Sequence, residues 1–190
     1  MTPPLTDNRE FEWTIDADNR FVSVNDNWLA FAEENDPYFA DPRVVLGRSL
    51  WEFVTDIQTR RIYDLLIDRV RSLQHPVNVP FRCDSPDCRR FMEVTLTTDG
   101  DGGIRFVSRV LRLEPRPAVE LLGASHLTSS RFLTLCSWCK RIRLPDDDFA
   151  EVEQAIERLD LFGEPVLPNL THGCCPDCFD SLIGRFRLAR

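Results

Sequence analysis

Two cysteine pairs in the last third of the chain constrain its fold more than any other feature of the sequence. Cys136 pairs with Cys139 and Cys175 with Cys178, each across two residues, and 35 residues separate the two pairs. A two-residue spacer lets one tight turn present both sulfurs to one ion, and Zn²⁺ takes four such soft ligands in a tetrahedron. We therefore expect a structural zinc site in which the four cysteines meet.

Two residues close to the second pair leave the ligand set open. His172 and Cys174 both lie within reach of a metal held by Cys175. A Cys₃His site that includes His172 therefore stands beside the four-cysteine site, in which His172 would be a hydrogen-bond donor next to the ligands. The cysteines could also be reduced core residues or redox thiols without metal.

The cysteine content also bears on the compartment. Seven cysteines are an odd number, and four of them are grouped in pairs instead of being spread as in a secreted disulfide framework. The first residues lack the basic and apolar regions of a signal peptide, and no apolar run approaches the roughly 20 residues that cross a bilayer. We expect a cytoplasmic protein with no membrane partner.

The charge of the chain argues against nucleic acid as a partner. The formal net charge is −8, and residues 131–190 contain 8 basic against 10 acidic side chains. Acidic surfaces repel phosphate backbones, so the charge weakens the alternative of a nucleic-acid-binding zinc ribbon.

The first half of the chain has the pattern of an α+β domain. Residues 11–15 and 21–24 are predicted strands, Ile62 to Leu73 have helical periodicity, and residues 77–82, 91–97 and 104–113 are predicted strands. Two strands, short helices, one long helix and three strands predict one domain with an antiparallel sheet.

Three segments of this half carry a family resemblance. The run at 15–25, the turn at 45–50 and the end of the last strand at 113–116 resemble a bacterial PAS sensory domain over residues 10–116. The resemblance implies an antiparallel sheet with flanking helices and a cavity that often holds haem, flavin or a small metabolite. The residues that could line it are Trp13, Trp28, Phe31, Trp51 and Phe53, which could equally fill a core.

The sequence names no ligand for this cavity. A flavin photosensor needs a reactive cysteine in the helical turn after Gly47, and none occurs there. Haem needs an axial ligand, and His75, the sole histidine of this half, stands at a helix end before Pro76. The cavity could also be filled by side chains alone.

The second half has a linker and a small cysteine-rich module. Proline and small polar residues predict a linker at 117–134 and a module at 135–190. A helix with Phe149 and Leu159 on its apolar face, capped by residues 146–148, and a last helix that opens at Pro176 are expected. This arrangement resembles a treble-clef or zinc-ribbon module.

The module carries a second resemblance. The segments C-S-W-C-K-R-I-R and H-G-C-C-P-D-C, within residues 135–180, look like a C-terminal module of bacterial signalling proteins. The resemblance implies a signalling context.

The function that these features favour is regulatory. No phosphate loop, zinc-protease or serine-hydrolase motif is present, and Cys83 and Cys88 flank a predicted turn that could bring them together as a reversible disulfide. We expect a non-catalytic signalling protein that binds a protein partner through its zinc module, with homodimer formation left open. The alternative is a thiol-based redox sensor that uses the C-x-x-C pairs.

Overall fold

The computed structural model describes residues 7–35, 37–123, 129–164 and 166–187. Residues 124–128 of the predicted linker lie outside these ranges. Among the described helices, none combines the length and the apolar character that crossing a bilayer requires.

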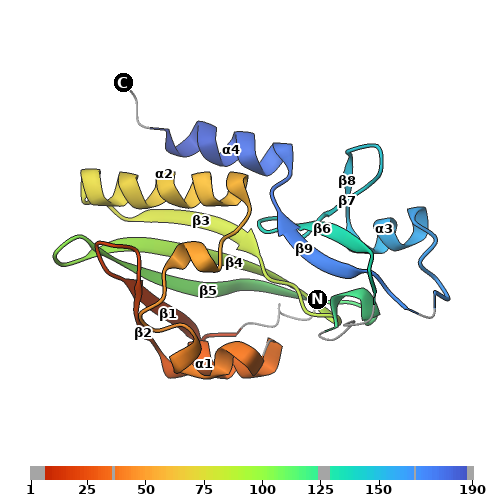
Figure 1. Cartoon of the computed structure of the whole chain (residues 1–190), viewed down its shortest axis with the longest axis horizontal. Coiled ribbons are helices and arrows are strands. Elements are labelled where there is room, and N and C mark those ends of the chain that lie inside the picture. Colours follow the sequence, from red (N-terminus) through yellow and green to blue (C-terminus); the bar gives the residue numbers. More distant parts are fainter. Residues whose placement is uncertain (1–6, 36, 124–128, 165, 188–190) are drawn as a thin grey trace, which may run out of the picture.

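The first half of the described chain is built on a five-stranded antiparallel sheet (Figure 1). Its elements in chain order are β1 (Glu10–Ile15), β2 (Phe21–Val24), α1 (Asp26–Asn35), the 3-10 helices η1 (Pro37–Ala40), η2 (Pro42–Val44) and η3 (Leu50–Glu52), α2 (Ile57–Leu73), β3 (Val77–Arg82), β4 (Cys88–Asp99) and β5 (Gly103–Pro115). The strand order is β2-β1-β5-β4-β3, with every neighbouring pair antiparallel. The expected α+β class and the antiparallel sheet are confirmed.

Helix α2 forms where the sequence predicts the long helix. The Asp56 carboxylate caps it by accepting a hydrogen bond from the backbone N–H of Thr59 at 2.7 Å. Ile62, Leu66 and Val70 recur at helical spacing and are buried. The helix ends at Leu73, and its C-cap residue, Gln74, has a left-handed φ of 54°.

The second half adds a four-stranded sheet with two helices. Its elements are η4 (Glu120–Leu122), β6 (Phe132–Cys136), β7 (Ile142–Arg143), β8 (Phe149–Ala150), α3 (Val152–Arg158), β9 (Asn169–Gly173) and α4 (Pro176–Phe186). The strand order is β8-β7-β6-β9, in which β6 and β9 run parallel and the other pairs are antiparallel. The last helix opens at Pro176 as predicted.

The prediction for the helix before it was wrong at its start. Phe149 pairs with Arg143 in the β7–β8 ladder, so α3 begins only at Val152. Its N-cap residue is Glu151, which makes no side-chain cap hydrogen bond. Asp147 instead occupies a left-handed turn with a φ of 65°, which takes residues 146–148 into the hairpin.

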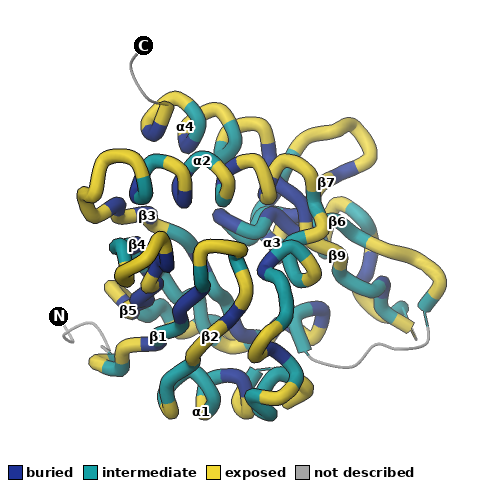
Figure 2. Tube along the Cα trace, turned by 60° about the vertical axis from the view of Figure 1, so that its left-hand side comes forward, coloured by how far each residue is buried: buried dark blue, intermediate teal, exposed yellow. Residues whose placement is uncertain are grey.

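The two halves share one hydrophobic core. Helix α4 lies alongside α2, and Leu182 and Phe186 of α4 belong to the same buried cluster as Ile62 and Leu66 of α2 (Figure 1). Figure 2 shows buried residues alternating with exposed ones along both helices. Burying a leucine or phenylalanine side chain stabilises a fold by roughly 1.5–3 kcal/mol, so this contact holds the second half against the first.

The segment predicted as a linker contributes to a second core. Val119 and Leu121 are buried against Leu135, Ile142 and Val152. The described part of the segment is therefore packed, and the division of the chain into residues 10–116, 117–134 and 135–190 stays a prediction.

An ion-pair network also joins the halves, here called the Asp84 network. The Asp84 carboxylate is 1% exposed and lies 2.5 Å from Nη2 of Arg82 and 3.4 Å from Nη1 of Arg116. Arg82 also contacts Glu151 at 2.9 Å, and Arg116 contacts Glu153 at 3.0 Å, at the start of α3. Two guanidinium groups of the first half are thus held between one buried carboxylate and two carboxylates of the second half.

We expect Asp84→Asn to lower the free energy of unfolding by about 3 kcal/mol, because it leaves two buried guanidinium groups without their shared carboxylate. Urea unfolding followed by circular dichroism measures the change. The matched control is Arg143→Gln, which removes a solvent-exposed ion pair with Asp147 and should cost about 0.5 kcal/mol or less. Equal effects of the two substitutions would contradict a structural role for the Asp84 network.

Candidate metal centre

The first cysteine pair lies in a tight turn, here called the knuckle (residues 136–141). Cys136 ends β6, and its backbone N–H donates to the carbonyl of Arg141 at 2.8 Å as the chain returns into β7. The N–H of Lys140 donates to the carbonyl of Cys136 at 3.0 Å, and Lys140 has a φ of 60°. This turn brings the sulfurs of Cys136 and Cys139 close to each other.

The second pair reaches the knuckle through the parallel pairing of β6 and β9. That register places Gly173 opposite Cys136, so Cys175 follows beside the first pair. A Cβ at Gly173 would stand 2.7 Å from Cγ2 of Thr134, so a larger residue there would have to displace the Thr134 side chain. Cys175 is the N-cap residue of α4, and its sulfur accepts a hydrogen bond from the N–H of Cys178 at 3.4 Å.

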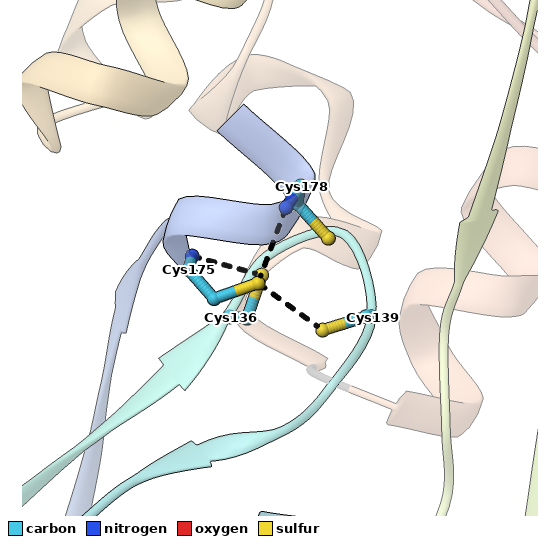
Figure 3. A group of neighbouring side chains, drawn as sticks. All are labelled: Cys136, Cys139, Cys175 and Cys178. Carbon is cyan, nitrogen blue, oxygen red and sulfur yellow. Dashed lines mark hydrogen bonds between the residues drawn. The ribbon is translucent and has the colours of Figure 1, made fainter. Parts of the chain in front are cut away.

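The four sulfurs come together as the spacing predicts (Figure 3). All lie within 4.8 Å of one another, and Sγ of Cys139 is 3.7 Å from Sγ of Cys175. Zinc–sulfur bonds of about 2.3 Å in a tetrahedron place neighbouring sulfurs about 3.8 Å apart, so these distances fit one ion. The cluster, Cys136, Cys139, Cys175 and Cys178, could therefore hold a metal ion.

The protonation of the cluster also fits a bound cation. Hydrogen bonds from Cys139, Cys174 and Cys175 lower the pKa of Cys136 well below its usual range. The contact with this sulfur raises the pKa of Cys139, but contacts with Cys175 and Cys178 outweigh it and lower the pKa to about 6. The pKa of Cys178 is raised, first by its contact with Cys136. The contacts among the sulfurs thus favour the thiolate form of Cys136 and Cys139 and the protonated form of Cys178. A divalent cation bound to all four sulfurs would displace the remaining protons.

Arg141 supplies positive charge at the edge of the cluster. Its Nε lies 3.3 Å from Sγ of Cys139, and its Nη2 lies 3.5 Å from Sγ of Cys175 and 2.8 Å from Asp177. Four thiolates around a Zn²⁺ ion leave an excess of negative charge, and a guanidinium donating to two of the sulfurs offsets part of it. The sequence placed Arg141 next to the pair without showing this contact.

His172 and Cys174 lie outside the cluster. The side chain of His172 is exposed, and Cys174 is buried with its thiol donating to the carbonyl of Cys175 at 3.5 Å. Besides the contacts among the thiols themselves, the four sulfurs accept hydrogen bonds from Arg141 and from the backbone N–H groups of Cys175 and Cys178.

An aromatic cavity of about 220 Å³ lies beside the knuckle. Three of the residues predicted for a ligand cavity, Trp13, Trp28 and Phe31, line it. Two others lie elsewhere: the ring of Trp51 packs under the guanidinium of Arg60 at 4.7 Å, and Phe53 packs edge-on against Phe21. Tyr63 of α2 and Ser137 and Trp138 of the knuckle also line the cavity, and nothing in their spacing predicted this.

Cys83 and Cys88 flank the predicted turn. Ser85 and Cys88 exchange backbone hydrogen bonds of 2.9 and 3.3 Å, and both cysteines are free thiols. Burial raises the pKa of Cys88, which makes it a poor nucleophile. A reversible disulfide between them stays a prediction.

Comparison with known proteins gives structural neighbours of low similarity. One is a sensory box sensor histidine kinase from Vibrio cholerae, which is 12% identical over 56% of this chain and 84% of that chain, with a TM-score of 0.40. Another is the PAS domain of Bordetella pertussis BvgS, which is 16% identical over 54% of this chain and 72% of that chain, with a TM-score of 0.38. A third is a domain of an HTR-like protein from Haloarcula marismortui, which is 12% identical over 54% of this chain and 97% of that chain, with a TM-score of 0.35. No family model matches the chain, and no curated protein does.

We expect the protein, purified without added metal, to contain about one zinc ion per chain, and Cys139→Ser to lose most of it because a hydroxyl is a poor fourth ligand. Elemental analysis by mass spectrometry measures the metal. Cys83→Ser, which changes a cysteine outside the cluster, should retain the zinc. Loss of zinc from His172→Ala with retention in Cys139→Ser would mean that the Cys₃His set is correct.

Proposed function

We propose that this chain is a non-catalytic signalling protein. Its PAS-like half binds a small ligand or forms a homodimer, and its structural zinc module presents a surface to a protein partner. The observation that carries the proposal is the four-cysteine cluster, whose buried members Cys136 and Cys175 belong to the same core as α2. A signal at the sheet therefore has a packed route to the metal module.

The coordination chemistry supports a structural zinc ion over a catalytic one. Catalytic zinc keeps one position open for water, whereas four cysteine sulfurs complete the tetrahedron. Cys136 and Cys175 are nearly inaccessible to solvent, so a substrate has little access to the ion. The site would tie the knuckle to the start of α4 and hold both against the first half.

The charges support a protein partner. The net charge of −8 opposes binding to a phosphate backbone. Free thiols at seven positions suit a reducing compartment, so we place the protein in the cytoplasm.

A thiol-based redox sensor is the second candidate. Cys139 is partly exposed, lies 3.3 Å from the Arg141 guanidinium, and has a pKa lowered to about 6. These are the features of a thiol that peroxide attacks, and oxidation of one zinc ligand would release the ion.

Metal analysis after mild peroxide separates the two candidates. We expect about one zinc ion per chain both before and after treatment, because coordination by zinc withdraws charge from the sulfurs. The free zinc is measured with a colorimetric chelator. Arg141→Gln is the matched variant: rapid zinc release from the native chain that slows in this variant would favour the redox sensor.

A further inference from the structure

A groove in the second half of the chain lies between η4 and α3, and is here called the η4–α3 groove. Residues 117–121 line one side of it, and Ile156 of α3 and the turn at residues 161–163 line the other. Its volume is about 360 Å³. The buried residues among its lining belong to the second hydrophobic core and are Val119, Leu121 and Leu161. The groove shares no lining residue with the aromatic cavity and contains no member of the cysteine cluster.

Apolar side chains that remain in water gather beside this groove. Phe162, which lines it, is 71% exposed, and Val166 is 43% exposed. An ion pair of 2.7 Å between Arg131 and Glu164 joins the start of β6 to the same turn, and Phe132, directly after Arg131, is 64% exposed. Every large apolar side chain that the described second half exposes thus lies within two residues of this ion pair in the sequence. Exposed apolar groups that gather beside an apolar groove are typical of an interaction site.

The charged groups around the groove are acidic. Glu120 and Glu153 line it, and no basic side chain is among the described lining residues. Glu153 already pairs with Arg116 at 3.0 Å. Glu157 lies four residues after Glu153 on α3, and residues with this spacing face the same side of a helix. Glu157 therefore adds a further carboxylate on the side of α3 that borders the groove.

Two of the acidic side chains are open to a partner. Glu157 and Asp160, which directly precedes Leu161, are exposed, and neither has an ion-pair partner in the part of the chain that the structure describes. Arg158, the basic residue between them, lies 3.5 Å from Asp148 instead. An apolar groove with unpaired carboxylates at its edge complements an apolar segment flanked by lysine or arginine.

The same charges disfavour a second copy of this chain as the occupant. In a symmetric dimer the same patch meets itself, so the acidic edges of two grooves would face each other. The net charge of −8 adds a general repulsion between copies. A basic partner gains from both terms.

We propose that the η4–α3 groove binds a short segment of a partner protein in which apolar side chains are flanked by lysine or arginine. The apolar side chains fill the groove beside Ile156 and cover the ring of Phe162, and the basic ones pair with Glu157 and Asp160. Aromatic residues are frequent among those that dominate binding energy, so Phe162 is the expected anchor. The inference rests on the proposed function in one respect, that the second half of the chain binds a protein partner, and it does not require the metal.

The test uses two synthetic peptides of equal length with leucine at the same positions, one with lysine and one with glutamate at the positions between them. Fluorescence anisotropy of the labelled peptides measures their affinity. The native chain should bind the lysine peptide at least about tenfold more tightly than the glutamate peptide. Phe162→Ser should weaken binding of the lysine peptide at least about tenfold. The matched control Ile57→Ser, which changes an 83% exposed side chain outside the groove, should bind it as the native chain does.

A charge reversal separates the local charge of the groove from the net charge of the chain. Glu157→Lys combined with Asp160→Lys should reverse the preference, so that the glutamate peptide binds more tightly. Asp18→Lys combined with Glu33→Lys makes the same change in net charge at two exposed positions of the first half and should keep the preference for the lysine peptide. All four side chains are exposed, so the variants should fold, which circular dichroism checks.

Several outcomes would overturn the inference. They are a native chain that does not bind the lysine peptide, equal binding by Phe162→Ser and Ile57→Ser, and equal effects of the two charge reversals. A native dimer in sedimentation that Phe162→Ser dissociates would mean that a second copy occupies the groove. Zinc content is measured on every sample: a chain without zinc that binds the lysine peptide through the groove contradicts only the zinc module of the proposed function. A zinc-bound chain that binds the peptide equally well after Phe162→Ser overturns the inference alone.

Discussion

Four sulfur atoms within 4.8 Å of one another stay together only if protons or a cation compensate their charge. In this chain they come from a turn and a helix start that 35 residues separate. The cluster thus fixes where β6, β9 and α4 meet, and α4 in turn packs on α2. A cation bound to the four sulfurs would therefore tie β6, β9 and α4 together beside α2.

The second half is also attached to the first at two other places, one by apolar packing and one by ion pairs. Leu182 and Phe186 of α4 bury apolar surface against α2, while the Asp84 network joins the sheet to α3 by charge. Trp138 also contacts the first half, through the ring of Tyr63 on α2 and the backbone N–H of Arg82 on β3. A movement of the knuckle would therefore change contacts with β3 and α2 and the lining of the aromatic cavity.

Local sequence patterns predicted the helices and strands well where a segment fitted only one periodicity. The periodicity of Ile62 to Val70 and the alternation in residues 77–82 and 104–113 appear as α2, β3 and β5. Phe149 was misassigned because an apolar residue can fit a helix face or a short ladder, and pairing with Arg143 decided for the ladder. Trp51 and Phe53 were grouped with the cavity because aromatic character does not show which way a side chain packs.

The sequence by itself determined the candidate metal ligands, since a two-residue spacer and the chemistry of sulfur act locally. It also determined the long helix and the strands, which follow from periodicity. Only the tertiary structure decided that Trp138 closes a cavity of the first half, that Arg141 donates to two of the sulfurs, and that Asp84 is buried between two arginines. Those contacts join residues far apart in the chain, and their geometry comes from packing that no local pattern records.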